Sequence, residues 1–207
     1  MSEVTGSEER LAMILSHPVI AQLRSSLASR QAVEAGDEAG VRRAAVALIF
    51  RAGEDGSPEL LFIKRAEYAG DPWSGQIAFP GGREESGDSS LQETAIRETR
   101  EETGIDIAGE GMVLGVLDDL RPRSIRIPAV VVRPYVTVLD RSEPLELSSE
   151  VALAFWIPFG SLAQEESWQQ DTVFARGVQI NARVFHHDDH VIWGMTERIL
   201  AQLLDLL

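Results

Sequence analysis

The chain has 207 residues, of which 44% are apolar and 25% are charged, so its composition is that of a globular protein and excludes a disordered or collagen-like chain. Its 19 Lys and Arg residues stand against 33 Asp and Glu residues, and the net charge of −14 opposes binding to a nucleic-acid backbone. The absence of cysteine excludes disulfides, thiol nucleophiles and cysteine-based metal sites.

The N-terminal part of the chain is predicted to be a helical extension. Apolar side chains recur at helical spacing over residues 8–34, with a break at Pro18, and a polar stretch containing glycine follows over residues 34–40. We therefore divide the chain into an N-terminal helical extension, residues 1–40, and one main domain, residues 41–207.

The main domain combines many strand patterns with few helices. Strands are predicted at residues 41–50, 59–64, 76–79, 112–118, 130–138, 151–157, 173–174 and 178–185. A helix is predicted over residues 90–103, where Ser90 and Glu93 have capping-box spacing and Gly104 is a stop signal. A short helix at 160–165 and a closing helix at 196–207 follow. This pattern favours an α/β or α+β layered sandwich over a doubly wound sheet.

Three glutamates crowd one face of the helix predicted at 90–103. Glu98, Glu101 and Glu102 are spaced i, i+3 and i+4, so they lie within a sector of about 100°. Two of them lie in the last turn, where the helix dipole disfavours negative charge. A divalent cation would offset the repulsion, and Mg²⁺ favours carboxylates together with water and phosphate oxygens. A solvated acidic face, with Arg97 paired to Glu101, explains the cluster alone equally well.

A Gly-Gly turn comes before this acidic helix. Gly81 and Gly82 follow the strand predicted at 76–79, and glycine permits a ligand or a metal to approach the backbone closely. The order of strand, Gly-Gly turn, polar loop and acidic helix therefore favours a ligand site over a solvated face.

The stretch from Gly82 onward resembles the signature of the Nudix hydrolases. That signature reads G-x5-E-x7-R-E-U-x-E-E-x-G-U, where U is a bulky apolar residue. Here Gly82 is the first glycine, and the second half is Arg-Glu-Thr-Arg-Glu-Glu-Thr-Gly-Ile at residues 97–105.

Three features of the stretch differ from the signature, and two of them resemble the coenzyme A pyrophosphatase branch of the family. Asp88 replaces the first glutamate, and the gap from Asp88 to Arg97 is one residue longer; the branch shares both features. The third difference is Thr99, which replaces the bulky apolar residue.

Two further segments resemble the same branch. Residues 75–82 are similar to its G-x-V-x-F-P-G-G lead-in, and residues 192–200 are similar to its I-W-G-x-T-A-x-I-L close. The resemblance covers residues 40–204. It departs at Gly70, where the branch has the second arginine of a pattern that marks coenzyme A specificity. The resemblance therefore constrains the substrate less than it constrains the reaction.

The resemblance implies a Nudix-type α/β/α sandwich around a mixed β-sheet. It implies an enzyme that uses Mg²⁺ or Mn²⁺ to cleave the diphosphate of a nucleoside-diphosphate derivative. Coenzyme A or an acyl-CoA is the first candidate, with 3′,5′-ADP and 4′-phosphopantetheine as products from coenzyme A. ADP-ribose, nucleotide sugars and dinucleotide polyphosphates are alternatives within the family. A non-catalytic nucleotide-binding Nudix-fold module and a plain acidic interaction protein are alternatives from other classes.

The resemblance also assigns roles to individual residues. Metal ligands would be Glu98 and Glu102, then Glu101, with the Gly82 carbonyl as a further ligand. The catalytic carboxylates would be drawn from Glu98, Glu101 and Glu150, and the signature does not fix which of them is the general base. The residues that would hold the signature in shape are Arg97, Gly104 and Asp88, the last as the partner of Arg97 or as an outer acid.

Substrate contacts are expected from a few cations and one aromatic ring. An acidic protein needs a local cationic patch to bind a polyanion. The best candidates are Arg65 and the loop arginines Arg121, Arg123 and Arg126. That the three loop arginines are merely solvated surface charge is an equal alternative. Trp73 either stacks on a base or packs down on the protein. The His-rich stretch at 186–190 falls where a turn is expected.

The sequence also predicts the surroundings of the protein. The acidic start has no pattern of a secretory signal, and the longest apolar runs, such as Ala45–Phe50, are too short to span a bilayer. We therefore expect a cytoplasmic protein with a small nucleotide-type substrate and without nucleic-acid or membrane partners. A homodimer is left open.

Overall fold

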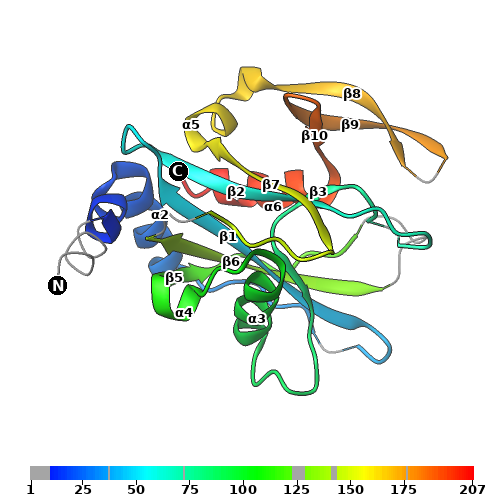
Figure 1. The fold of residues 1–207 in the computed structure, drawn as a ribbon, viewed down its shortest axis with the longest axis horizontal. Coiled ribbons are helices and arrows are strands. Elements are labelled where there is room, and N and C mark those ends of the chain that lie inside the picture. The colour runs from blue at the N-terminus through cyan, green and yellow to red at the C-terminus, as the bar shows by residue number, and fades with distance from the viewer. Residues whose placement is uncertain (1–9, 37, 72, 123–128, 141–143, 176) are drawn as a thin grey trace.

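A central β-sheet organises the chain, and helices cover both of its faces (Figure 1). The computed structural model describes residues 10–36, 38–71, 73–122, 129–140, 144–175 and 177–207. Within these residues, the central sheet has seven strands: β1 (Arg42–Ala52), β2 (Pro58–Arg65), β3 (Ile77–Ala78), β4 (Gly81–Arg83), β5 (Gly111–Val116), β6 (Val130–Leu139) and β7 (Val151–Pro158).

The strand order is β3-β2-β1-β6-β5, with β4 beside β1 and β7 beside β2. Strands β1 and β6 run parallel, whereas the other pairs are antiparallel, so the sheet is mixed. Strand β1 is buried on both faces: Leu48 and Phe50 point to one side, and Ala47 and Ile49 to the other. Burial on both faces explains why the sequence of β1 is a nearly continuous apolar run.

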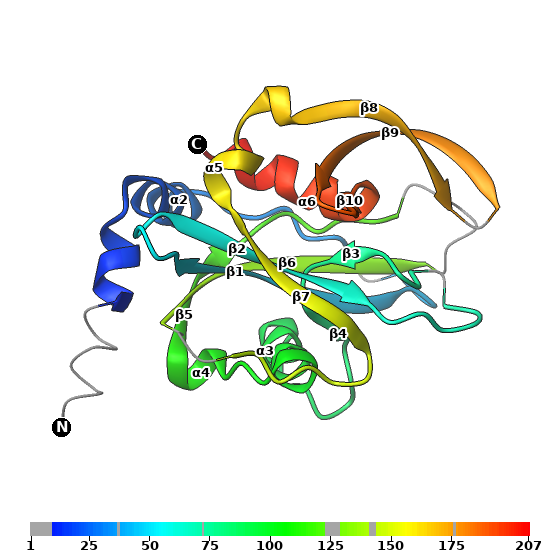
Figure 2. The ribbon, with the colours of Figure 1, turned by 45° about the horizontal axis from the view of Figure 1, so that its top comes forward.

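Helices form the two outer layers of the sandwich (Figure 2). Helices α3 (Leu91–Thr103) and α4 (Ile107–Glu110) cover one face, and α2 (Pro18–Ser29) and α6 (Gly194–Leu204) pack on the other. The predicted α/β/α sandwich around a mixed sheet is thus confirmed. None of the helices in the described part of the chain is long and apolar enough to cross a membrane.

The N-terminal segment packs directly on the main domain. Residues 10–16 are helical and α2 follows, but the helix ends at Ser29 rather than near residue 34. The apolar side chains of α2 belong to the same core as the sheet. After α2 the chain is extended, and Val33 and Ala35 donate their N–H groups to Asp118 and Asp119 at 2.8 Å each. The division at residue 40 stays a prediction.

A second, smaller sheet lies beyond α5 (Phe159–Leu162) and the 3₁₀ turn η1 (Glu165–Ser167). The short helix predicted at 160–165 is present as α5, but it begins one residue earlier and is shorter, and a separate 3₁₀ turn follows it. Among the described residues, the second sheet has three antiparallel strands: β8 (Trp168–Ala175), β9 (Val178–His187) and β10 (His190–Ile192). The strand predicted at 173–174 is thus longer than expected. The turn expected in the His-rich stretch is confirmed between β9 and β10.

Candidate active site

Helix α3 is fixed at both ends by residues that the sequence identified. The Ser90 side chain accepts a hydrogen bond from the Glu93 N–H at 3.2 Å, and Gly104 ends the helix in the left-handed conformation. These caps set the rotation of the helix, so that Ala95, Thr99 and Glu102 face the sheet. The helix predicted at 90–103 is thereby confirmed, with Ser90 as its cap.

Gly81 and Gly82 do not form the expected turn, because they are the first two residues of β4 and pair with Val46 and Ala45 of β1. They bring β4 against both β1 and α3. Gly81 has a φ of 146°, and a Cβ atom there would lie 2.2 Å from the backbone oxygen of Ala45. A Cβ atom on Gly82 would lie 2.3–2.5 Å from the carboxyl group of Glu98. A side chain at Gly81 would push β4 away from β1, and one at Gly82 would clash with Glu98 of α3, so both glycines are required for this close approach.

Glu102 is the buried carboxylate of the site, with 3% of its surface exposed. Its Oε2 atom accepts a hydrogen bond from the Gly81 N–H at 2.8 Å, and its Oε1 atom lies 3.8 Å from Nη1 of Arg65. Burial raises the pKa of Glu102 to about 7, although the hydrogen bond from Gly81 and the charge of Arg65 oppose this rise. A carboxyl group that is hard to ionise alone is suited to a partner that brings positive charge.

Glu98 lies one turn earlier on α3 and points toward Gly82. Burial raises its pKa, and the negative charges of Glu101 and Glu150 add to that rise, while Arg97 lowers it. Glu150 lies just before β7, and its charge also raises the pKa of Glu102. Three carboxylates from two separate elements thus contribute to one negative potential.

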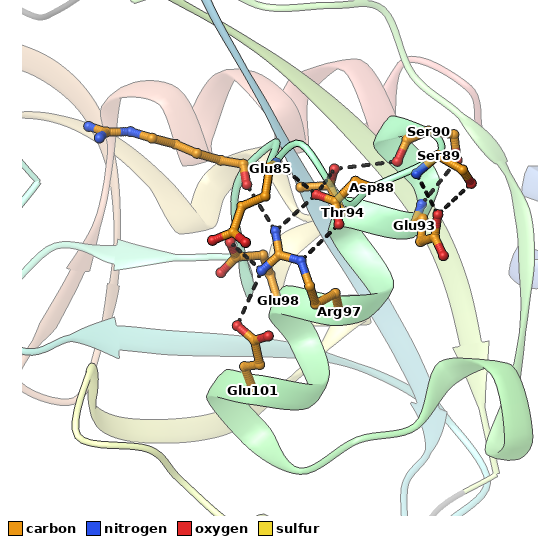
Figure 3. A network of polar contacts seen from close by, with 10 residues as sticks. Glu85, Asp88, Ser89, Ser90, Glu93, Thr94, Arg97, Glu98 and Glu101 are labelled. Atoms are coloured by element: carbon orange, nitrogen blue, oxygen red, sulfur yellow. Dashed lines mark hydrogen bonds and ion pairs between the residues drawn. The ribbon is translucent and has the colours of Figure 1, made fainter.

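Arg97 holds the loop before α3 in place. Its guanidinium donates to both carboxylate oxygens of Asp88, at 2.9 and 3.0 Å, and to the Arg83 backbone oxygen at 3.0 Å. It also reaches Glu98 at 3.0 Å and Glu101 at 3.2 Å, as Figure 3 shows. These hydrogen bonds hold the pKa of Asp88 well below its usual range.

A cleft of about 500 Å³ lies between β4, the loop before β3 and helix α6. The predicted site residues that line it are Arg65, Trp73, Gly82, Glu98, Glu102 and Glu150. Its wall also has apolar residues, namely Val46, Val130, Met195 and Ile199. The cleft therefore offers both charged and apolar surface to a ligand.

Other predicted site residues lie outside the lining of the cleft. The side chain of Glu101 is 60% exposed and contacts Arg97. Arg121 forms an ion pair with Glu38, with both guanidinium nitrogens at 2.8–2.9 Å from the carboxylate oxygens. Arg123 and Arg126 lie outside the described residues. The roles proposed for these four residues stay predictions.

Arg83 lines the cleft directly after Gly82, although the sequence did not single it out. Its side chain is exposed, and within the described residues it has no ion-pair partner. Its position next to Gly82 was the available signal, because a side chain there must lie close to whatever the two glycines approach. Arg83 is therefore a free cation in the lining of the cleft.

The carboxylates of the cleft fit a hard divalent cation in their chemistry. Among the residues that the structure describes, no three His, Asp or Glu side chains converge closely enough to hold a metal ion by themselves. Glu98, Glu102 and the Gly82 carbonyl supply oxygen donors only, and Mg²⁺ typically takes a few such donors together with water and substrate oxygens. The raised pKa values of both glutamates indicate negative charge that such a cation would relieve.

Comparison with known proteins decides the family. The family model described as "NUDIX domain" matches residues 41–176. The chain belongs to the Nudix hydrolase family. It is 32% identical over 157 residues to the mitochondrial coenzyme A diphosphatase NUDT8 of Homo sapiens, which covers 73% of this chain. The match spans only 64% of the length of NUDT8.

Two further Nudix relatives support the same family and fold. The "Uncharacterized Nudix hydrolase NudL" of Salmonella paratyphi B is 32% identical over 147 residues, covering 70% of this chain and 73% of NudL. A MutT/nudix family protein from Enterococcus faecalis superposes with a TM-score of 0.54 at 17% identity. That superposition covers 95% of this chain and 71% of the other, and it shows a shared fold.

Proposed function

We propose that this Nudix protein hydrolyses the diphosphate of a nucleoside-diphosphate derivative, with Mg²⁺ or Mn²⁺ held by Glu98 and Glu102 and coenzyme A or an acyl-CoA preferred. The observation that carries the proposal is that Glu102 contacts the Gly81 backbone and Glu98 lies against Gly82 in the lining of one cleft. A diphosphate is strongly anionic, so two carboxylates would repel it without a cation between them. The products from coenzyme A would be 3′,5′-ADP and 4′-phosphopantetheine.

The residues of the chain have separable tasks in this proposal. A bound divalent cation would supply charge neutralisation of the diphosphate and would lower the pKa of the attacking water. Arg65 and Arg83 both line the cleft and would bind the phosphate oxygens. Glu150 also lines the cleft. We therefore assign to Glu150 or Glu98, rather than to the exposed Glu101, the role of general base that accepts a proton from the attacking water.

The preference for coenzyme A has support from two sides. The relative NUDT8 is named a coenzyme A diphosphatase, and residues 75–82 and 192–200 resemble the same branch of the family. The apolar residues in the wall of the cleft suit the uncharged pantetheine arm of coenzyme A. Gly70 favours the alternatives, because it lines the cleft without the arginine of the branch pattern. ADP-ribose, nucleotide sugars and dinucleotide polyphosphates are therefore the second candidate group.

A substrate panel tests the proposal directly. The full chain is incubated with coenzyme A, ADP-ribose, a nucleotide sugar and a dinucleotide polyphosphate, each with Mg²⁺, with Mn²⁺ or with EDTA, and the products are separated by chromatography. We expect 3′,5′-ADP from coenzyme A, with turnover abolished by EDTA. Faster cleavage of ADP-ribose with coenzyme A inert would select the second group. Binding without turnover of any substrate would favour the non-catalytic module.

A further inference from the structure

A second pocket of about 450 Å³ adjoins the cleft. Asp71, Gln76 and Ile77 line both spaces, so a ligand can extend from one into the other. On its far side, the second pocket is lined by Phe174 of β8 and His190 of β10. The proposed diphosphate chemistry uses only the cleft, and the second pocket has no role in it.

Lys64 is the only lysine of the chain, and it lines this second pocket. Within the described residues, its side chain has no ion pair and no hydrogen bond. Four described arginines share this lack of a partner, and all four are exposed: Arg24, Arg42, Arg83 and Arg100. Lys64 is half-buried instead. A half-buried cation without an ion-pair partner, in a protein of net charge −14, is suited to bind an anionic ligand.

The backbone of β2 places two neighbouring cations in two neighbouring spaces. Strand β2 shifts its register against β7 between Lys64 and Arg65. Arg65 lines the cleft and reaches toward Glu102, whereas Lys64 lines the second pocket. Because the two spaces share Asp71, Gln76 and Ile77, one ligand can place an anionic group at Lys64 and a diphosphate at Arg65. The pair therefore suits a ligand that carries two separate anionic groups.

The other groups of the second pocket are compatible with an anion and a flat ring. Asp71 is already engaged, because Arg65 lies 3.3 Å away and the Trp73 N–H donates to it at 3.1 Å. Asp189 is the remaining acid of the lining, and it lies exposed in the turn between β9 and β10. Phe174 is 72% exposed and offers an uncovered ring to a base.

We propose that the second pocket binds the end of the substrate that carries a phosphomonoester, and that Lys64 contacts this phosphate. The proposal rests on the proposed function, since it assumes a substrate whose diphosphate lies in the cleft. In coenzyme A the phosphomonoester is the 3′-phosphate of the adenosine. Lys64 is then a residue that selects coenzyme A over substrates with the same diphosphate and no further phosphate.

Kinetics with coenzyme A and dephospho-coenzyme A, which lacks the 3′-phosphate, test this selection. We expect the wild-type kcat/KM to be about 10- to 100-fold higher for coenzyme A, as for one charge-assisted contact. Lys64→Gln should bring the ratio of the two kcat/KM values close to one, because it lowers kcat/KM for coenzyme A alone. Lys64→Arg should keep most of the ratio. Arg24→Gln is the matched control, because it removes an equally unpaired positive charge on α2 and should leave the ratio unchanged.

The outcomes separate this proposal from the proposed function. Equal kcat/KM values for the two substrates in the wild type, or the same ratio in Lys64→Gln as in the wild type, would overturn the role of Lys64 and leave the hydrolase proposal standing. If the wild type cleaves neither substrate, the hydrolase proposal for coenzyme A fails, and a binding measurement decides the role of Lys64.

That binding measurement uses the single lysine as its probe. Reductive methylation with ¹³C-formaldehyde labels only Lys64 and the terminal amine, and Lys64→Gln assigns the lysine signal in the NMR spectrum. We expect 3′,5′-ADP to shift this signal in a saturable manner and adenosine, which has no phosphate, to leave it nearly unmoved. No shift with 3′,5′-ADP, or an equal shift with adenosine, would overturn the proposal.

Discussion

Helix α3 carries charged side chains on two sides, and the fold treats them in opposite ways. On one side, Asp88 and Arg97 share two hydrogen bonds, and the pKa of Asp88 is held well below its usual range. On the other side, Glu102 is buried with a single backbone hydrogen bond, and its pKa is raised to about 7. Glu98 lies between the two sides and contacts Arg97.

This difference separates residues that hold the site from residues that act in it. A carboxylate whose hydrogen bonds are satisfied favours its ionised form and stabilises the fold. A buried carboxyl group without an adequate counter-charge destabilises the folded protein when it is ionised. Such groups are expected in clefts that bind ligands. We therefore infer that Asp88 and Arg97 position α3, and that Glu98 and Glu102 meet the ligand.

The largest expected effect comes from Glu102→Gln, which removes the charge and keeps the shape. We expect kcat to fall by about three orders of magnitude with Mg²⁺ present, because a metal ligand that contributes several kcal/mol to the transition state is lost. Glu101→Gln is the matched control on the exposed side of α3 and should reduce kcat less. Equal losses in the two variants would mean that Glu101 joins the site when ligands bind. Near-normal activity of Glu102→Gln would refute the assignment of the site.

The second expected effect is on stability and concerns the other side of the helix. Asp88→Asn leaves Arg97 without its bidentate partner, and breaking such a pair lowers the free energy of unfolding by about 3 kcal/mol. Urea unfolding of the wild type, Asp88→Asn, Arg97→Gln and the double variant measures the coupling. If the single variants unfold like the wild type but lose activity, Asp88 and Arg97 would belong to the chemistry instead.

Local signals in the sequence were sufficient to predict helix α3. Ser90 and Gly104 mark the ends of α3 because capping depends on residues within one turn of each end. The layered sandwich followed from the alternation of apolar residues and from the resemblance of the stretch after Gly82. These features depend on neighbours in the sequence, so a single sequence contains them.

Contacts between distant residues were not predictable in the same way. Arg121 is paired with Glu38, 83 positions away, and nothing near either residue in the sequence indicates this pair. Strand β8 begins at Trp168, whose indole donates to the Leu162 backbone oxygen at 2.9 Å, and it pairs with β9 along its whole length. The role of Lys64 likewise depends on which strands come together around it. Such features require the folded chain.

The third prediction uses pH to separate the two sides of α3 in metal-free protein. The pKa of Glu102 rises from 4.5 to about 7 on folding, so its contribution is present below pH 4.5 and is lost as the pH rises through 7. We expect the free energy of unfolding to fall by about 3 kcal/mol over this range. Glu102→Gln should flatten the decline, and Mg²⁺ should stabilise the protein more at pH 8 than at pH 5.

Asp88 should act in the opposite direction and at lower pH. Because its pKa is lowered on folding, its contribution is present above its ordinary value of 3.8 and is lost as the pH falls. Asp88→Asn should therefore flatten the acid part of the stability profile and leave the neutral part unchanged. Urea titrations between pH 3 and pH 8 measure both parts. A wild-type profile without a decline between pH 4.5 and pH 7 would contradict the raised pKa of Glu102.

The smallest expected effect concerns the capture of the substrate by the free cation of the cleft. Arg83→Gln should lower kcat/KM about 10-fold, mostly through KM, because the variant loses one charge-assisted contact to a phosphate. Arg121→Gln is the matched variant: Arg121 lies outside the lining of the cleft and pairs with Glu38, so we expect at most about a twofold change. An equal loss in Arg121→Gln would mean that substrate contacts extend from the cleft to the loop arginines. The same assay on Arg123→Gln and Arg126→Gln would then identify which of them contribute.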